Sequence, residues 1–303
     1  MTPPRAELHL HWYGAIPPAT VLELARRHRV ALPADTPEGL REWFRFRDFD
    51  HFLEVMSAVG DVVADADDVE LVTWEIAREL ARQRVGYAEV MITPANVERR
   101  GIPFARCLEA MDRGRLRARD ELGLELRWIL DVYRATPAAR RAYWVDMTLE
   151  AAIAGRDAGV VALGLSGPEA GHPPEPFAPW FERARAAGLH SVPHAGELAG
   201  AESVWGAVRA LHPERIAHGV RAIEDPALVA HLAERGIVLD VCPTSNVCLG
   251  VYPSLAGHPL RRLHESGVPV TVNSDDPTMF ATTLDDEIAA LSGHLGLGDA
   301  AVR

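Results

Sequence analysis

The stretch ELHLHWYGAI, residues 7–16, reads as a buried strand that places two histidines, His9 and His11, one residue apart. Side chains alternate between the two faces of a strand, so both imidazoles point to the same side. A strand that opens a doubly wound nucleotide-binding sheet would be followed by a glycine-rich phosphate turn, and HLHWYG is not such a turn. The pair alone is as typical of two inert, hydrogen-bonded histidines as of a metal site.

Short runs rich in Val, Ile and Leu alternate with longer amphipathic stretches along the whole chain. Strands are predicted over 6–11, 86–93, 124–132, 160–167, 190–196, 215–220, 237–245 and 268–276. Helices are predicted between them, for example over 18–28, 68–85, 225–236 and 258–267. Eight strands alternating with helices favour a (β/α)8 TIM barrel of the α/β class, with an open doubly wound sheet as the alternative.

Residues 33–67 form a predicted helical insertion between strand 1 and the long helix that follows it. Its aromatic residues are Trp43, Phe44, Phe46, Phe49 and Phe52. We expect them to pack over the barrel, and some of the rings could equally wall a pocket at its mouth. The chain has no linker, low-complexity tract or internal repeat, so residues 1–303 are predicted to form a single barrel domain.

Composition excludes several classes of function. The formal net charge of −12 argues against a nucleic-acid partner, which usually requires a basic stripe. The three cysteines form no CxxC pair and suit a reducing compartment. The N-terminal sequence MTPPRAELHLH has no apolar signal core, and no segment approaches the length of a membrane span. A cytoplasmic protein with no membrane contact is therefore expected.

In a (β/α)8 barrel, side chains at the C-terminal ends of the strands form the active site. Seven ionisable or metal-binding side chains fall at the predicted ends of strands 1, 5, 6 and 8. They are His9, His11, His194, Glu197, His218, Asp275 and Asp276. Three imidazoles and a carboxylate are a plausible ligand set for a catalytic zinc ion that also holds a water molecule. Each residue taken alone also has an ordinary explanation, as a core histidine or as the cap of a turn.

Four ordered motifs, over nearly the whole chain, are similar to those of the adenosine deaminase family of metal-dependent amidohydrolases. They are HLH (9–11), HAGE (194–197), AHG (217–219) and SDDP (274–277). The segment GLSGPE (164–169) resembles the glycine turn that this family places beside the substrate purine. The resemblance implies a (β/α)8 barrel, one zinc ion per chain, and hydrolytic loss of an exocyclic amino group from a purine as ammonia.

The resemblance also implies a role for each matching residue. The implied zinc ligands are His9, His11, His194 and Asp275. Glu197 matches the acid that serves the ring nitrogen next to the attacked carbon, and His218 matches the histidine beside the zinc-bound water. Asp276 matches the carboxylate that contacts both purine and water, and Gly167 matches the glycine whose backbone N–H meets the purine. His11 is expected to face the substrate as well as the metal.

The chemistry of deamination requires such groups independently of the resemblance. Zinc supplies a nucleophile by lowering the pKa of its bound water toward ~7. Addition to the aromatic carbon destroys ring aromaticity, so the adjacent ring nitrogen must receive a proton. Glu197 can donate that proton only where its surroundings keep it protonated. His218 can orient the water, take its proton, or stabilise the developing charge.

The sequence departs from the family pattern in its first motif, which normally reads HxHLDG or similar. Tyr13, next to Trp12, stands where the family has an acidic residue that meets the ribose of adenosine. Aromatic rings cannot accept hydrogen bonds from sugar hydroxyls as a carboxylate does, but they can stack or lengthen a pocket. Tyr13 is therefore predicted to bind substrate and to disfavour plain adenosine.

The segments SVPHAGE, DVCPTSNV and VTVNSDDP are most similar in sequence to those of the actinobacterial branch of the family. That branch includes enzymes that deaminate 6-amino-6-deoxyfutalosine, a 5′-modified adenine nucleoside. This resemblance implies a 5′-modified aminopurine as substrate, with adenosine or adenine as the alternative. Only one helix, over 284–296, is predicted after strand 8, whereas the family usually continues further, so a shortened chain or a less well closed barrel is expected.

Other zinc deaminases and other hydrolases of the same barrel have different sequence motifs. Cytidine-type zinc deaminases use HxE with PCxxC, and neither motif occurs here. Hydrolases of the same barrel that act on amides, esters or phosphoesters often bridge two metals with a carboxylated lysine. All 31 basic residues are arginine, so such a site is excluded. A catalytically inactive purine-binding barrel is the alternative from another class. The expected partner is a small aminopurine, and a homodimer is compatible with the sequence.

Overall fold

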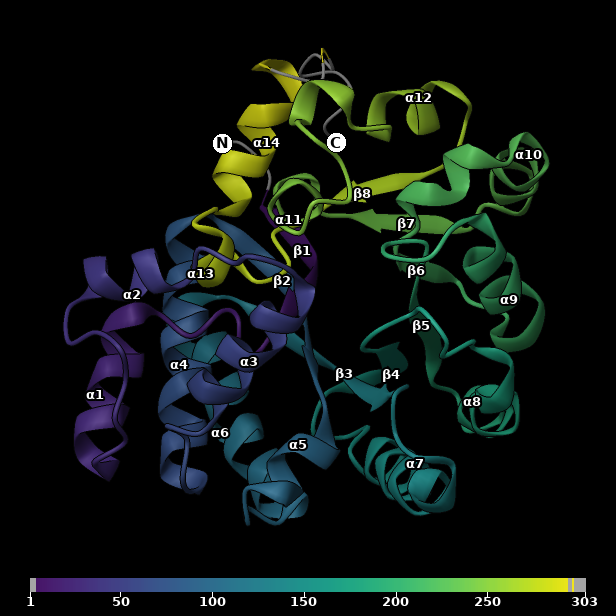
Figure 1. The fold of residues 1–303 in the computed structure, drawn as a ribbon. Helices are drawn as coiled ribbons and strands as arrows, with labels where there is room; N and C mark the ends of the chain where they lie inside the picture. The colour runs from purple at the N-terminus through teal and green to yellow at the C-terminus, as the bar shows by residue number, and fades with distance from the viewer. Residues whose placement is uncertain (1–3, 294–295, 297–303) are drawn as a thin grey trace.

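The structure, a computed structural model, describes residues 4–293 and 296. Eight parallel strands follow one another around a single sheet in chain order. They are β1 (Arg5–His11), β2 (Val85–Ile92), β3 (Glu125–Tyr133), β4 (Val160–Ser166), β5 (His190–Ala195), β6 (Arg215–His218), β7 (Val238–Val241) and β8 (Val270–Val272). Helices lie outside these strands in Figure 1, with α1, α4 and α6 on one side and α7, α8 and α9 on the other. The predicted (β/α)8 TIM barrel is confirmed.

The helices are α1 (Pro18–His28), α2 (Pro37–Trp43), α3 (Phe49–Gly60), α4 (Ala66–Arg82), α5 (Pro94–Arg99), α6 (Phe104–Leu122), α7 (Ala138–Ala154), α8 (Ala178–Ala186), α9 (Ala201–Leu211), α10 (Pro226–Arg235), α11 (Pro243–Cys248), α12 (Leu260–Glu265), α13 (Pro277–Phe280) and α14 (Leu284–Gly293). The helices predicted over 18–28, 68–85, 225–236 and 258–267 are present as α1, α4, α10 and α12, with ends within three residues of the predicted ones. The start of α4 is fixed by a capping box between Asp65 and Asp68. Residues 294–295 of the predicted last helix lie outside the described residues.

The barrel closes between its first strand and the segment just after β8. The His11 N–H donates to the Asp275 carbonyl at 2.8 Å, and the Asp275 N–H donates to the His9 carbonyl at 3.0 Å. The Leu8 N–H adds a bond of 2.9 Å to the side-chain oxygen of Asn273. These bonds join the two ends of the sheet, so the expectation of a poorly closed barrel is not met in this part of the chain.

Three predicted strands end earlier than expected, because the backbone turns at residues that sequence patterning counted as strand. β6 ends at His218, and Gly219 takes a φ of 67°. β7 ends at Val241, because α11 begins at Pro243. β8 ends at Val272, and Asp275 takes a φ of 63°. The early end of β8 places Asp275 and Asp276 on a turn at the rim, whereas His218 is the last residue of β6.

Two kinds of core support the rim. A small buried cluster (Met91, Ile129, Ala162, Val192 and Ala217) takes one residue from each of β2 to β6. Because it lies apart from the larger cores that pack the helices onto the sheet, we place it inside the barrel. A packed interior of this kind gives the rim residues a fixed floor. Among the described helices, none combines the length and the apolar character that crossing a bilayer requires.

The 33–67 segment folds into α2 and α3, which lie on the same side of the molecule as α1 and α4 (Figure 1). Its aromatic residues pack together as expected. The Phe52 ring stacks on Phe280 at 5.5 Å, and Phe46 contacts both rings edge-on. Phe49 and Phe52 also line a cavity at the barrel mouth, so the insertion serves both of the predicted purposes.

Candidate active site and metal centre

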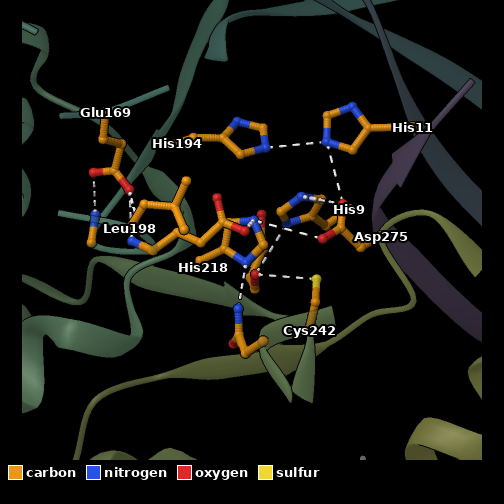
Figure 2. Close-up of polar contacts among 12 residues, drawn as sticks. His9, His11, Glu169, His194, Leu198, His218, Cys242 and Asp275 are labelled. Atoms are coloured by element: carbon orange, nitrogen blue, oxygen red, sulfur yellow. Dashed lines mark hydrogen bonds and ion pairs between the residues drawn. The ribbon is translucent and has the colours of Figure 1, made fainter. Parts of the chain in front are cut away.

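Four side chains with metal-ligating atoms meet at the rim where the barrel closes. The Nε2 atoms of His11 and His194 lie 3.1 Å apart. His9 Nε2 and His11 Nε2 lie 3.5 Å and 3.4 Å from the same Asp275 oxygen, Oδ1. Figure 2 shows these imidazoles directed toward one another and toward Asp275. Two neutral imidazole nitrogens with lone pairs repel at this distance, so a proton or cation must lie among them.

The surroundings of these ligand atoms fit a cation. His9 Nδ1 lies 3.1 Å from the Asp240 carbonyl oxygen and donates its proton there, which leaves Nε2 as the lone-pair nitrogen. That Nε2 is buried and has no hydrogen-bond partner. Burial lowers the pKa of His11 to about 4, and it lowers the pKa of His194 well below its usual value. Neutral imidazoles are the form that binds a metal ion, so these residues fit one.

The shifted pKa values of His9 and Asp275 also indicate that a positive charge belongs beside Asp275. Burial acts to lower the pKa of His9, but the Asp275 carboxylate outweighs it and raises that pKa to about 9. Burial acts to raise the pKa of Asp275, and His9 and its neighbours hold that pKa well below its usual range. Asp275 is 3% exposed and ionised, and its position requires positive charge beside it.

Three further predicted residues face the same space. His218 Nε2 lies 3.5 Å from Glu197 Oε1 and 3.7 Å from Asp275 Oδ2. Burial, then the nearby Asp275 and Glu169 charges, raises the pKa of Glu197 well above its usual value. Burial and Asp275 likewise raise the pKa of Asp276. The structure thus brings all seven predicted side chains to one rim, with two carboxyls there in surroundings that favour the protonated form.

Local backbone geometry explains the glycine that ends the HWYG motif. A Cβ on Gly14 would lie 1.7 Å from Asp276 Oδ1, so only glycine lets that carboxyl approach the turn that follows β1. His218 and Asp275 both adopt left-handed φ values, 64° and 63°. Non-glycine residues rarely do so, and such conformations concentrate at functional sites.

Glu169, which had no assigned role in the sequence, holds the loop that carries Glu197. Its carboxylate accepts hydrogen bonds of 2.8 Å from the backbone N–H groups of Gly196, Glu197 and Leu198. It also accepts one from the Ser203 hydroxyl at 2.5 Å. Figure 2 shows Glu169 above the Leu198 backbone, on the far side of the site from His11. No spacing rule links residue 169 to residue 197, so sequence patterning could not find this contact.

A second buried carboxyl lies below the rim on β3. Asp131 is 1% exposed, and neither of its carboxylate oxygens has a hydrogen-bond partner. A Cβ on Gly164 would lie 1.9 Å from Asp131 Oδ1, so the neighbouring strand leaves room for it by having no side chain there. Burial raises the pKa of Asp131 to about 7. This group was also missed, because it reads as one polar residue in an apolar strand.

A cavity opens above the metal-binding cluster and encloses about 750 Å³ of empty space, part of it open to solvent. Its floor holds His11, His194, Glu197, His218, Asp275 and Asp276. Its apolar wall holds Phe49, Phe52, Leu53 and Met56 of α3. Gly167 also lines it, with a φ of 96°, and a Cβ there would lie 2.6 Å from the Tyr133 ring.

Tyr13 and Trp12 differ in how they meet this cavity. The Trp12 indole N–H donates to the Thr73 hydroxyl on α4 at 3.2 Å, so Trp12 is chiefly a core residue. The Tyr13 ring lines the cavity and lies 5.4 Å from the Arg100 guanidinium carbon. Arg100 in turn donates to the Ser57 carbonyl of α3 at 2.9 Å. Both residues of the predicted aromatic pair therefore line the cavity, with Trp12 also bonded to α4 and Tyr13 also tied to the insertion through Arg100.

Comparisons with known proteins agree with this geometry. The chain is 45% identical over 302 residues to the aminodeoxyfutalosine deaminase of Streptomyces coelicolor, covering 98% of this chain and 76% of that protein. It resembles the crystal structure of an adenine deaminase from Arthrobacter aurescens, with a TM-score of 0.89 and 33% identity over 98% of this chain and 89% of the other. It also resembles a zinc-bound amidohydrolase from Burkholderia ambifaria, with a TM-score of 0.88 and 29% identity over 99% and 82% of the two chains.

The family model for adenosine deaminase matches residues 4–303, nearly the whole chain. The match spans the barrel, the cluster of imidazoles and the carboxyls beside it. The chain therefore belongs to the adenosine deaminase family and is a metal-dependent deaminase of the amidohydrolase type, a hydrolase that acts on carbon–nitrogen bonds.

Proposed function

We propose that this protein is a zinc-dependent deaminase that converts a 6-aminopurine to the 6-oxo product and releases ammonia, with a 5′-modified adenosine as its substrate. The observation that carries the proposal is the cluster of His9, His11, His194 and Asp275, which faces a cavity whose floor also holds Glu197. A nucleophile site and an acid on one cavity floor are what addition to an aromatic C–NH2 carbon requires.

The three imidazoles and Asp275 would hold one zinc ion. Nitrogen and carboxylate donors suit zinc, and a set of protein ligands that leaves a position open is typical of catalytic sites. When bound, the ion supplies a Lewis acid that makes water a nucleophile near neutral pH. The zinc present in the Burkholderia amidohydrolase supports this choice of metal.

Glu197 would give its proton to the ring nitrogen next to the attacked carbon. It lies on the cavity floor and is 7% exposed, and burial and neighbouring carboxylates raise its pKa well above the usual value, which favours the protonated form. His218, whose Nε2 lies 3.5 Å from Glu197 Oε1, would contact the oxygen that adds to the ring. Asp276 and the Gly167 N–H would contact the purine itself, and both residues line the cavity.

The substrate preference rests on Tyr13 and on the wall that α3 supplies. Tyr13 offers the cavity an aromatic face and no carboxylate that could accept hydrogen bonds from ribose hydroxyls. Phe49, Phe52 and Met56 add apolar surface where a substituent beyond the nucleoside would lie. The Streptomyces aminodeoxyfutalosine deaminase supports 6-amino-6-deoxyfutalosine as that substrate, and the Arthrobacter enzyme makes adenine the second candidate.

The remaining expectations complete the proposal. Residues 1–303 would act as one catalytic barrel domain with a small aminopurine as its only required partner. The buried, unpaired thiols of Cys107 and Cys242 support a cytoplasmic location. A homodimer is compatible with the proposed activity.

An ammonia-release screen tests the function directly. Zinc-loaded protein is offered adenine, adenosine, a series of 5′-substituted adenosines and 6-amino-6-deoxyfutalosine, and kcat/KM is measured for each. The proposal predicts a 5′-modified adenosine as the best substrate. Adenine as the best substrate would replace it with the second candidate, and ammonia release from none of them would overturn the deaminase assignment for aminopurines.

A further inference from the structure

A chain of buried side chains leads away from His218 on the side opposite the cavity. Asn246, on α11, places its Nδ2 3.3 Å from His218 Nδ1. Its Oδ1 lies 3.0 Å from Nε2 of His258, in the loop before α12. His258 Nδ1 in turn lies 3.2 Å from the backbone nitrogen of Leu260, the first residue of α12. Asn246 and His258 are 0% and 4% exposed, so solvent cannot replace these bonds.

The backbone N–H of Leu260 fixes the donor and the acceptor of every hydrogen bond in this series of side chains. A backbone N–H can only donate, so Leu260 makes His258 Nδ1 an acceptor. The proton of a neutral imidazole must then be on His258 Nε2, which donates to Asn246 Oδ1. The carboxamide is thereby oriented with its NH2 group toward His218, and that group donates to His218 Nδ1. Burial lowers the pKa of His258 to about 4, which agrees with a neutral ring.

We infer that Asn246 and His258 are positioning residues that fix the tautomer of His218, so that His218 presents an Nε2–H donor to the cavity floor. This inference deepens the proposed deaminase function, on which its kinetic part rests. His218 Nδ1 accepts a bond from Asn246, and the one proton of the neutral ring must therefore be on Nε2. That atom faces Glu197 and Asp275, at 3.5 Å and 3.7 Å.

The fixed tautomer selects among the roles that the sequence left open for His218. A neutral imidazole with its proton on Nε2 has no lone pair on the cavity side, so it cannot take a proton there. It can donate a hydrogen bond to the oxygen that adds to the purine and so stabilise the charge that develops on it. The structure therefore favours orientation and charge stabilisation over proton removal.

Tyr252 contacts the same loop as His258 and offers a matched control for a purely structural effect. The Tyr252 ring packs against His258 at 5.1 Å, and its hydroxyl donates to the Val220 carbonyl at 3.3 Å, two residues beyond His218. Tyr252→Phe keeps the ring and removes that tether, but it leaves the chain from Leu260 to His218 intact. If Asn246 and His258 only stabilise the loop, Tyr252→Phe and substitutions of Asn246 or His258 should cause similar losses of activity.

The direct test is the tautomer itself. Nitrogen-15 shifts of histidine side chains distinguish Nδ1–H from Nε2–H rings, and comparison with His218→Gln assigns the His218 signals. The zinc-loaded parent should show the Nε2–H form. Asn246→Asp is nearly isosteric but can only accept on both sides, so it should move the His218 proton to Nδ1. This readout does not depend on which substrate the enzyme accepts.

Kinetics then measure the consequence. Asn246→Asp should lower kcat by about 10² or more with KM within a few-fold, because removal of one oriented donor typically costs that much. His258→Gln, whose amide can still donate to Asn246, should retain far more activity than His258→Phe. An Nδ1–H tautomer in the parent, or an Asn246→Asp enzyme that keeps both the Nε2–H form and near-parental kcat, would overturn the inference. Absence of any aminopurine turnover would instead refute the proposed function and leave the tautomer result standing.

Discussion

The Oε1 atom of Glu169 lies 2.8 Å from the backbone nitrogen of Glu197 and accepts its N–H. The same carboxylate accepts two neighbouring N–H groups at the same distance, so the loop that carries the acid is built around a buried anion. Bonds from N–H donors to a charged acceptor are stronger than neutral ones. The position of Glu197 is therefore set from residue 169, on a different strand end.

Glu169→Gln tests this dependence. The amide NH2 would face backbone donors, so we expect the free energy of unfolding to fall by about 2–4 kcal/mol and kcat to fall at least tenfold. Urea unfolding and steady-state kinetics measure the two effects. Glu182→Gln, on the exposed face of α8, is the control and should change neither. A Glu169→Gln enzyme with parental kcat would show that the loop holds its shape without the charge.

Metal content is the second prediction. Purified protein should carry about one zinc equivalent, and chelation should abolish activity and lower Tm, because an ion that binds only the folded state stabilises it. His11→Ala should lose metal with little loss of fold, because the barrel core lies below the rim. Elemental analysis and circular dichroism check both statements. Full occupancy in a His9→Ala, His11→Ala double variant would refute the ligand assignment.

The acid is the third prediction. Glu197→Gln keeps the size and most hydrogen bonds of the side chain but removes the proton that the ring nitrogen needs. Turnover should fall by on the order of 10² or more while zinc is retained, given the usual contribution of general acid catalysis. Ammonia release and metal content are measured on the same sample. Turnover within a few-fold of the parent would leave Glu197 a structural role only.

Tyr13 gives the fourth prediction, which concerns specificity. Tyr13→Asp restores an acceptor for ribose hydroxyls and should shift the ratio of kcat/KM values toward adenosine with zinc content unchanged. Tyr13→Phe is the matched control, because it keeps the ring in the cavity and beside Arg100 and removes only the hydroxyl. It should retain the parental ratio. If adenosine is the best substrate of the parent and Tyr13→Asp leaves the ratio unchanged, Tyr13 serves only to anchor the insertion.

Asp131 gives the fifth prediction, a dependence of stability on pH. Its pKa in the folded protein is about 7, above the value of about 4 expected in the unfolded chain. Between these values the folded state holds a proton that the unfolded state has released, so the free energy of unfolding falls as pH rises. The fall ends near pH 7 and amounts to as much as about 4 kcal/mol.

Urea unfolding of the zinc-loaded protein at pH 5 and pH 7.5 measures this effect. Asp131→Asn cannot ionise, so its stability should fall less over that interval than that of the parent. Asp157→Asn, at an exposed position after α7, should behave as the parent. Equal pH dependence in the parent and in Asp131→Asn would show that the Asp131 carboxyl ionises normally.

Local sequence patterns were enough to predict the barrel and the residues that lie at its rim. Alternation and strand ends predicted the position of His194 and His218, because both lie where an apolar run stops. Contacts between distant segments left no such pattern. The bonds from the loop at 196–198 to Glu169, and from Asn246 to His218, are seen only in the folded chain, where separate strand ends come together. Sequence spacing describes one element at a time, whereas these bonds join two.

The seam of the barrel has a consequence for how the protein is made. His9, His11 and Asp275 supply ligand atoms from the two ends of the chain, and their backbones also form the bonds that close the sheet. A nascent chain therefore cannot assemble the metal site until its last strand has left the ribosome. The bound ion would link the first strand to the segment after β8 in addition to these backbone bonds, so metal loss is expected to weaken the seam at the rim while the barrel core below it stays folded.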